Sequence, residues 1–339
     1  MADISCDILV VGAGVLGLCV AVELTARGHD VRVVDPGRAN ASSVAAGMIA
    51  PAFEALLDGA DAARAALLRD AAALWPAFAA RAGIALDKTP AEWRGDDEEE
   101  AAGTLAALGF AVEREDVLRA SGDLRLDAEA SLKTLQASLA SQVVIAEARS
   151  VEKTSSGWRI DTTAEPIVAR GLVVATGAAQ ALPGLPVETA AIIDRVEPIA
   201  GQIGRTARPL TDRVLRSREA YVAPVEGGVL IGATMVFGSR DIAPDPAASD
   251  RLAGLAGRLV GIDPPLGIEW RGGVRGATPD GLPLAGQVED GLHLALAPRR
   301  NGWLLGPLVG RIVADGIEGR SRGSHAAAFD PLRFSPPVD

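Results

Sequence analysis

Residues 6–17, CDILVVGAGVLG, decide the fold class of this chain. Residues 6–11 form an apolar run of strand length, and residues 15–27 carry apolar side chains at helical spacing. A second apolar run, residues 31–35, ends on Asp35. The order strand, glycine-rich turn, helix and strand predicts a βαβ unit that opens a parallel sheet.

The spacing of Gly12, Gly14 and Gly17 is typical of a turn that binds the pyrophosphate of a dinucleotide. The first glycine permits the tight turn, the second lets the backbone approach the phosphates, and the third lets the helix pack on the strand. Asp35 then accepts a hydrogen bond from a ribose hydroxyl, and its charge disfavours the 2′-phosphate of NADP. The motif leaves NAD and FAD open, and the alternative is a purely structural glycine turn.

Composition bounds the class of protein. The chain has 339 residues, which suggests about two domains, and 48% hydrophobic residues, too many for a disordered chain. The net charge of −11 disfavours nucleic acid and anionic membranes as partners. Two cysteines and the absence of a long apolar run predict a cytoplasmic protein with no membrane span, and residues 1–5 do not read as a signal peptide. The scattered histidines predict no metal site.

Further elements follow from periodicity. Helices are expected near 61–81 with a break at Pro76, from the acidic run 96–100, and near 127–141, 247–260 and 303–315. Strands are expected near 143–152, 157–162, 171–175 and 267–275, with antiparallel strands between 195 and 235.

Several sequence blocks stand in one order over nearly the whole chain. They are the glycine motif, AAGM at 45–48, VVATG at 173–177, YVAP at 221–224, GATM at 232–235, the block 275–286, RNG at 300–302 and the tail 329–334. Together they resemble the FAD-dependent D-amino-acid oxidase superfamily and, within it, the glycine oxidases of thiamine biosynthesis. Residues 52–127 match this family least and look shortened.

The resemblance implies an α/β fold, with a Rossmann-like FAD-binding domain and a smaller substrate domain built on an antiparallel sheet. The FAD-binding domain is expected to collect residues 1–75, 128–190 and 273–339. The substrate domain is expected to collect residues 76–127 and 191–272.

The resemblance also implies noncovalent FAD, because neither Cys6 nor Cys19 stands where some relatives tether the flavin. The helix start near Gly302 supplies unpaired amides and a positive dipole end, which suit the negative pyrimidine edge of reduced flavin. The predicted FAD contacts are Gly12, Gly14, Val15, Leu16, Gly17, Asp35, Pro36, Ser42, Ser43, Ala46, Gly47, Met48, Ala148, Val151, Thr176, Gly177, Pro298, Arg299, Arg300, Asn301, Gly302, Trp303 and Leu304.

By resemblance, Arg275 grips the substrate carboxylate, a task that suits the planar fork of a guanidinium. Arg300 and Tyr221 are further predicted polar contacts of the substrate, and Met48 and Met235 are apolar ones. An arginine taken alone is most often a solvated surface residue. No residue is assigned as a catalytic acid or base.

The implied reaction is oxidative deamination of glycine, a small amino acid or a secondary amine, by hydride transfer to flavin N5. The products are an oxo acid, ammonia or an amine, and hydrogen peroxide. The expected partners are the amine and O₂, with no nucleic acid, and a homo-oligomer is left open. Three alternatives remain: a dehydrogenase that uses a quinone or carrier, an NAD-linked Rossmann oxidoreductase without flavin, and a flavin-binding protein without catalysis.

Overall fold

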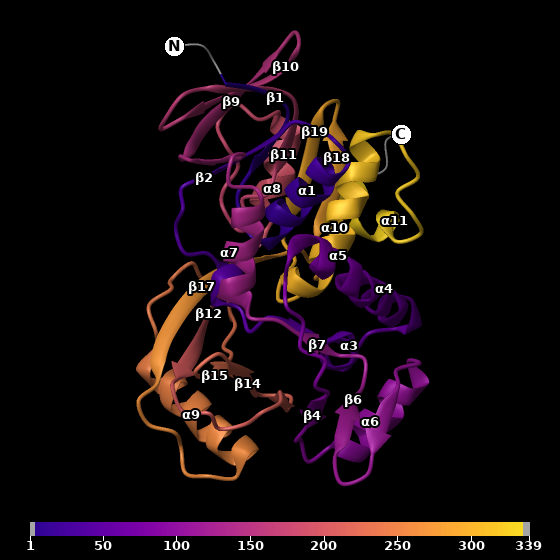
Figure 1. Ribbon diagram of the computed structural model, residues 1–339, viewed down its shortest axis with the longest axis vertical. Coiled ribbons are helices and arrows are strands. Elements are labelled where there is room, and N and C mark those ends of the chain that lie inside the picture. The colour runs from indigo at the N-terminus through magenta and orange to yellow at the C-terminus, as the bar shows by residue number, and fades with distance from the viewer. Residues whose placement is uncertain (1–3, 335–339) are drawn as a thin grey trace. The chain divides into compact units, whose positions relative to one another are not determined.

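The computed structural model describes residues 4–334, and the chain divides into two compact units. The first unit consists of three segments: the chain up to Ser42, Leu132–Ile199, and the chain from Arg275 onward (Figure 1). The second takes Ser43–Ser131 and Ala200–Val274. The first segment of the predicted FAD-binding domain ends at residue 75, whereas the first segment of the first unit ends at Ser42. That the first unit binds FAD and the second binds the substrate stays a prediction.

A largely parallel sheet forms the centre of the first unit. Its strand order is β18-β19-β11-β1-β2-β8, and a β9–β10 hairpin extends it through β11. The strands are β1 (Ile4–Val11), β2 (Val31–Asp35), β8 (Val143–Ile145), β9 (Ala148–Thr154), β10 (Gly157–Thr162), β11 (Ile167–Val174), β18 (Leu284–Glu289) and β19 (Leu292–Leu296). Strand β1 pairs in parallel with β2 and with β11, which confirms the predicted βαβ opening. The central strands are apolar on both faces, as parallel strands covered by helices must be.

Two long helices of this unit pack closely: α1 (Val15–Ala26) and α10 (Gly302–Ile317) run side by side in Figure 1. A Cβ atom added to Gly306 would lie 2.8 Å from Cys19 Sγ, and one added to Gly310 would lie 2.8 Å from the Cys19 carbonyl oxygen. Only glycine at these positions allows the two backbones to approach so closely. The remaining helices of the unit are α8 (Val187–Asp194), α11 (Ala326–Phe329) and the 3₁₀ turn η1 (Pro331–Phe334).

The last described residues are part of the first unit's core. Phe329 is fully buried, and the Arg333 guanidinium binds the Asp280 carboxylate with an Nε–Oδ2 distance of 2.8 Å. Asp280 belongs to the connection between β17 and β18. The tail therefore stabilises the turn that leads into the edge strand.

A mixed, mostly antiparallel sheet forms the second unit, in the order β16-β12-β15-β14-β13-β4-β6-β5, with β17 on β12. The strands are β4 (Ala91–Trp93), β5 (Val112–Arg114), β6 (Leu118–Ala120), β12 (Glu197–Thr206), β13 (Leu215–Arg216), β14 (Tyr221–Val225), β15 (Gly228–Gly232), β16 (Val236–Phe237) and β17 (Glu269–Ala277). One pair, β13 with β4, is parallel. Helix α9 (Pro246–Val260) packs on one face, where Leu252 and Leu255 join Val222, Val229 and Ile231 in an apolar cluster.

Shorter elements complete the second unit. The chain forms α2 (Ala41–Val44), α3 (Pro51–Asp58), α4 (Ala62–Ala73), α5 (Trp75–Ala82), α6 (Glu98–Ala107), and a two-stranded ribbon of β3 (Met48–Ile49) with β7 (Leu124–Arg125); helix α7 (Ala128–Ser138) begins here. The predicted break at Pro76 occurs at Leu74, because a proline is tolerated in the first turn of the new helix. The expected helices at 127–141 and 247–260 are present with slightly different ends, whereas α3 was not predicted.

The close packing of α10 on α1 predicts a steric defect. We expect Gly310→Val to lower the free energy of unfolding by about 1–3 kcal/mol, because its Cβ meets the backbone of Cys19, which has no room to move. Gly254→Val in α9 is the matched control, since its Cβ meets only the Arg258 side chain at 4.0 Å. Urea unfolding followed by circular dichroism measures both variants, and equal midpoints would contradict the packing argument.

Candidate functional site

The turn between β1 and α1 leaves no room for side chains at two of its glycines. Gly12 has a φ of 111°, and a Cβ there would lie 2.4 Å from the Ala175 carbonyl oxygen. A Cβ on Gly17 would lie 2.1 Å from the Gly12 carbonyl oxygen. The first glycine therefore permits the turn, and the third lets α1 pack on it, as the spacing predicts.

Asp35 holds this turn from the end of β2. Its Oδ2 accepts a hydrogen bond from the Ala13 amide at 2.8 Å, and its Oδ1 accepts one from the Gly37 amide at 2.8 Å. An ionised carboxylate has about four acceptor sites, so each oxygen retains capacity for a further donor. Its position at the end of β2 is thus compatible with the predicted bond from a ribose hydroxyl.

The N-terminus of α1 is suited to an anion. Its N-cap, Gly14, offers no side chain, and the first turn contains no acidic residue. One of the first amides, that of Val15, donates to Ser42 Oγ at 3.0 Å. The other first-turn amides have no partner within the helix, and the positive end of the dipole lies here. Phosphate groups bind readily at such an end.

A second helix N-terminus adjoins the first. A Cβ on Gly302 at the start of α10 would lie 3.1 Å from Val15 Cγ1, and Trp303 Nε1 donates to the Ser42 carbonyl at 3.1 Å. Two residues of the preceding loop, Ala297 and Arg299, have φ values of 60° and 50°. Left-handed conformations at such residues cost of order 1 kcal/mol or more and concentrate at functional sites.

These features fit a dinucleotide. Thr176 follows β11 at the same edge of the sheet, and its buried Oγ1 has no hydrogen-bond partner within the described residues 4–334. Beside it, Gly177 has a φ of 68° and no atom within 4 Å of an added Cβ. Two helix N-termini, a carboxylate and an unused hydroxyl therefore gather at the carboxyl ends of the parallel strands, where α/β proteins bind nucleotides.

The predicted substrate arginines lie on neighbouring backbone segments of the first unit. Arg275 is in β17, and Arg300 precedes α10. The Arg299 amide donates to the Gly276 carbonyl at 2.8 Å, and Ala277 forms an antiparallel bridge with Pro298. Both arginines are half-buried. The fold thus brings together two segments that are more than twenty residues apart in the sequence.

The other predicted substrate contacts belong to the second unit. Tyr221 begins β14, and its ring covers Gly232 of β15, where an added Cβ would lie 2.2 Å from Tyr221 Oη. Met48 pairs with Arg125 in the β3–β7 ribbon, and Met235 precedes β16. All three predicted contacts are half-buried.

Sequence comparison decides the family. The model of the DAO family, FAD dependent oxidoreductase, matches residues 7–316. The chain belongs to this family. The oxidoreductase therefore uses FAD, and its described residues contain no helix long and apolar enough to cross a membrane.

Relatives of the oxidoreductase carry several names. It is 31% identical to the glycine oxidase of Geobacillus kaustophilus, over 97% of this chain and 96% of that protein. It is 28% identical to the tRNA 5-methylaminomethyl-2-thiouridine biosynthesis bifunctional protein MnmC of Caulobacter sp., over 90% of this chain and 53% of that protein. The crystal structure of the Geobacillus glycine oxidase has a TM-score of 0.79, 24% identity, and coverage of 98% of this chain and all of that one. The D-amino-acid-oxidase type of fold is thereby confirmed.

Other predicted FAD contacts of the oxidoreductase are engaged within the protein. The Gly47 carbonyl accepts from the Leu126 amide at 3.0 Å, and the Val151 amide donates to the Pro183 carbonyl at 2.9 Å. Pro36 is exposed at the end of β2, and Ala148 opens β9. Ser43 and Ala46 belong to the second unit. For all of these residues, contact with FAD stays a prediction.

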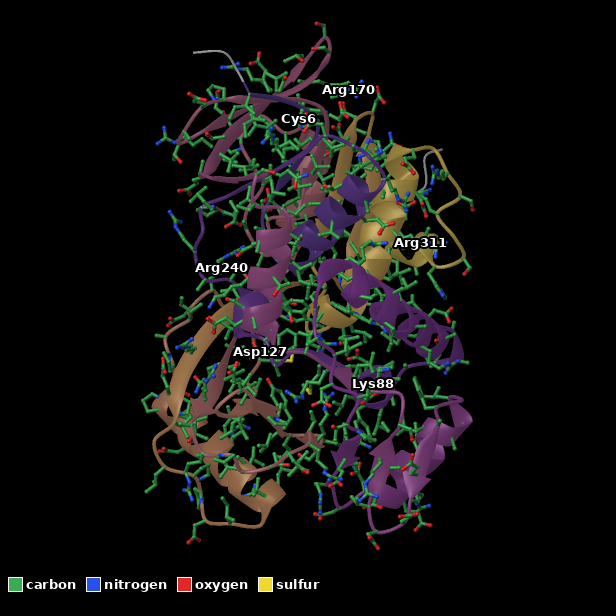
Figure 2. The ribbon with its side chains drawn as sticks, in the orientation of Figure 1. Cys6, Lys88, Asp127, Arg170, Arg240 and Arg311 are labelled. Carbon is green, nitrogen blue, oxygen red and sulfur yellow. The ribbon has the colours of Figure 1, made fainter. Side chains whose placement is uncertain are left out.

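Both cysteines of the oxidoreductase are free and buried, as expected of small core residues. Cys6 lies in β1 (Figure 2), and burial raises the pKa of its thiol to about 12. Its thiol is therefore protonated at neutral pH, which makes it a poor nucleophile.

A buried charge cluster in the second unit was not predicted from the sequence. Arg216 pairs with Glu54 at an Nη2–Oε1 distance of 2.8 Å, and Asp123 accepts from the Ala52 amide at 3.4 Å. Arg216 Nε and Nη1 and Asp123 Oδ2 have no hydrogen-bond partner within the described part of the chain. Arg216 is the cross-strand neighbour of Tyr221, so this cluster adjoins a predicted substrate contact. The sequence signal was Glu54 itself, a charge within the apolar helix PAFEALLD.

Burial raises the pKa of Asp123 to about 8, although the positive charge of Arg216 acts in the opposite direction. The folded protein therefore retains a proton between about pH 4 and pH 8 that the unfolded chain has lost. Stability consequently falls as pH rises through this window, by up to about 1.4 kcal/mol per pH unit.

We expect Asp123→Asn to flatten this dependence, because the amide remains neutral at every pH. The free energy of unfolding, measured in urea at pH 5 and pH 8, should favour the variant more at pH 8. The exposed Asp96→Asn substitution is the matched control. An identical pH dependence in wild type and Asp123→Asn would show that Asp123 is ionised in the folded protein.

We expect Asp35→Ala to weaken FAD binding by at least about tenfold, because it removes an acceptor for the ribose and a support of the glycine turn. FAD fluorescence during titration of the deflavinated protein measures the dissociation constant. Asp30→Ala is the control, since Asp30 precedes β2 on the exposed side of the same unit. Wild-type affinity in Asp35→Ala would remove Asp35 from the FAD site.

Proposed function

We propose that this oxidoreductase oxidises the C–N bond of glycine or of another small amino acid or secondary amine, with O₂ as the electron acceptor. The amine loses two hydrogens to give an imine, and water converts the imine to an oxo acid with release of ammonia or an amine. O₂ takes up the two electrons and two protons as hydrogen peroxide. The observation that carries this proposal is the 31% identity to a glycine oxidase over nearly the full length of both chains.

Arg275 is proposed to bind the substrate carboxylate. A guanidinium makes two parallel charge-assisted hydrogen bonds to a carboxylate, which fixes the orientation of the attached carbon. Support comes from the backbone bond between the Arg299 amide and the Gly276 carbonyl, which ties the segments of Arg275 and Arg300 together. Two cationic residues on neighbouring segments favour an anion in this region. Tyr221 is proposed as a further hydrogen-bond donor to the carboxylate, with Met48 and Met235 as apolar contacts.

The FAD-binding role is proposed for the turn of Gly12 to Gly17, Asp35, Thr176 and the N-terminus of α10. FAD supplies a two-electron acceptor when it is bound. The protein residues orient the amine, and no side chain needs to act as a base if the amine is bound in its neutral form.

A spectroscopic titration tests the proposal. The purified protein should show a flavin absorption band, and anaerobic addition of glycine, sarcosine or a small D-amino acid should bleach it. Admission of air should restore the band with release of peroxide. A band that none of these amines bleaches would refute the substrate class, and a bleached band that air does not restore would point to another electron acceptor.

Replacing Arg275 with Gln should raise KM at least about thirtyfold for the amine that bleaches the flavin. The reason is that removal of one partner of a hydrogen-bonded charge pair costs about 2 kcal/mol or more of binding free energy. Arg208→Gln, an exposed arginine of the second unit, is the control. Steady-state peroxide release measures both variants, and wild-type kinetics in Arg275→Gln would remove Arg275 from the site.

Gly232→Ala should displace the Tyr221 ring, because the new methyl group would overlap its hydroxyl at 2.2 Å. We expect kcat/KM for the same amine to fall about tenfold or more while FAD content is retained, since a lost hydrogen bond to a charged group costs about 1.5–3 kcal/mol. Tyr221→Phe removes the hydroxyl and keeps the ring, so it distinguishes the effect of the lost hydrogen bond from the effect of a displaced ring. Unchanged kinetics in both variants would remove Tyr221 from the substrate site.

A further inference from the structure

Tyr221 lies between two cross-strand neighbours of very different size. It pairs with Gly232 of β15 on one side and with Arg216 of β13 on the other. Residues directly opposite on neighbouring antiparallel strands point to the same face, with Cβ atoms about 4.5–5.5 Å apart. Gly232 has no side chain, whereas Arg216 has a long one. The ring of Tyr221 lies over Gly232, where an added Cβ would be 2.2 Å from its Oη and 2.3 Å from its Cζ.

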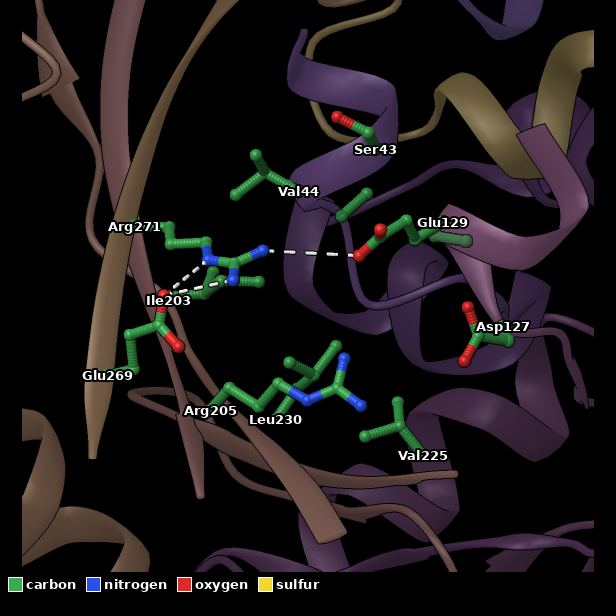
Figure 3. A pocket seen from close by; sticks show the side chains of 12 residues that line it. Ser43, Val44, Asp127, Glu129, Ile203, Arg205, Val225, Leu230, Glu269 and Arg271 are labelled. Carbon is green, nitrogen blue, oxygen red and sulfur yellow. Dashed lines mark hydrogen bonds and ion pairs between the residues drawn. The ribbon is translucent and has the colours of Figure 1, made fainter. Parts of the chain in front are cut away.

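This row of residues belongs to the sheet face that α9 does not cover. Gly232 also pairs with Ile203 of β12, and in the next row of the same face Leu230 pairs with Arg205. The side chains of Ile203, Arg205 and Leu230 extend from this face in Figure 3. The residues that alternate with them along the strands pack with α9. Tyr221 therefore lies outside the apolar cluster that α9 covers.

Arg216 is held in place by buried contacts. Its Nη2 lies 2.8 Å from Glu54 Oε1, and the two side chains are only 5% and 7% exposed. The Ser217 amide donates to the Ala220 carbonyl at 2.9 Å, which closes the turn between β13 and β14. This turn sets Arg216 opposite Tyr221. Both the side chain and the backbone of Arg216 are thus fixed beside the tyrosine.

Fold stability does not account for this pair. Burial raises the pKa of Asp123 to about 8, so at neutral pH Glu54 is the ionised partner of Arg216. Two further donors of the guanidinium, Nε and Nη1, are buried and have no hydrogen-bond partner among residues 4–334. A buried donor without a partner destabilises a fold, and a buried ion pair is often no more stabilising than apolar residues of the same volume.

We propose that the Arg216–Glu54 pair positions Tyr221 for the substrate. Arg216 blocks the β13 side of the phenol ring, Glu54 holds the guanidinium in place, and the ring keeps its orientation over Gly232. Without the pair the ring turns toward β13, and its hydroxyl group leaves the position from which it binds the carboxylate. Arg216 and Glu54 are positioning residues, since they act through Tyr221. This inference rests on the proposed role of Tyr221 in amine oxidation.

Nuclear magnetic resonance tests the orientation of the ring without turnover. Tyr221 is the only tyrosine of the chain, so tyrosine labelled with ¹³C at Cζ reports on this residue alone. We expect its resonance to shift in Arg216→Gln and in Glu54→Gln, and to shift less in Arg216→Lys, which keeps a cation for Glu54.

Arg119→Gln is the matched control for this measurement. Arg119 Nε lies 3.1 Å from Oε1 of the buried Glu92 in the same unit, and its strand β6 does not pair with β14. The resonance should keep its wild-type position in this variant. A resonance that stays unchanged in Arg216→Gln and Glu54→Gln, or that shifts equally in Arg119→Gln, overturns the inference. If Arg216→Gln does not fold, Arg216→Lys and Glu54→Gln decide.

Kinetics tests whether the pair acts through Tyr221. With the amine that bleaches the flavin, kcat/KM for peroxide release should fall about tenfold or more in Arg216→Gln, mainly through KM, and should partly recover in Arg216→Lys. In a Tyr221→Phe background Arg216→Gln should cause no further loss, because the hydroxyl is already absent. Equal losses in both backgrounds overturn the inference. If no amine is oxidised, the proposed function fails, and the tyrosine resonance still decides whether the pair positions Tyr221.

Discussion

The close approach of α10 to α1 is the constraint on which the proposed FAD site depends. Gly306 and Gly310 let the α10 backbone lie against Cys19, and Gly302 lets its first turn lie against Val15. Because the helices touch at these glycines, their N-termini end side by side at the carboxyl edge of the sheet. The positive ends of two helix dipoles then stabilise negative charge in the same region, whereas one helix would supply only one such end. The glycines of α10 thereby place two helix N-termini, and their positive dipole ends, next to each other.

The two faces of one sheet in the second unit carry different kinds of side chain. The face with Val222 and Ile231 packs on α9 and excludes water. Tyr221 and Arg205 belong to the opposite face, which follows from the alternation of side chains along a strand. The cost of this arrangement is visible at Arg216 and Asp123, whose buried polar atoms are only partly satisfied. An unsatisfied polar group of this kind destabilises the fold, because it loses its hydration in a medium of low dielectric constant.

Local patterns allowed part of the fold to be predicted. The βαβ opening depends on neighbouring residues, and Gly12 and Gly17 have the steric roles that their spacing indicates. Helix α3 and the strands β18 and β19 were missed, because short apolar segments have no distinctive period. The Glu54–Arg216–Asp123 cluster was missed for another reason. Its members are separated by tens of residues, and only folding brings them together.

The sequence by itself determined the glycine turn, the acidic end of β2 and the family, because each depends on residues at fixed short spacing or on the order of motifs. Tertiary structure alone decided which backbone segments neighbour each other. It joined Arg299 to Gly276, set Ser42 against Val15 and Trp303, and aligned Arg205 with the row next to Tyr221. The physical reason is that strand register and helix packing are set by long-range burial, which no local spacing encodes.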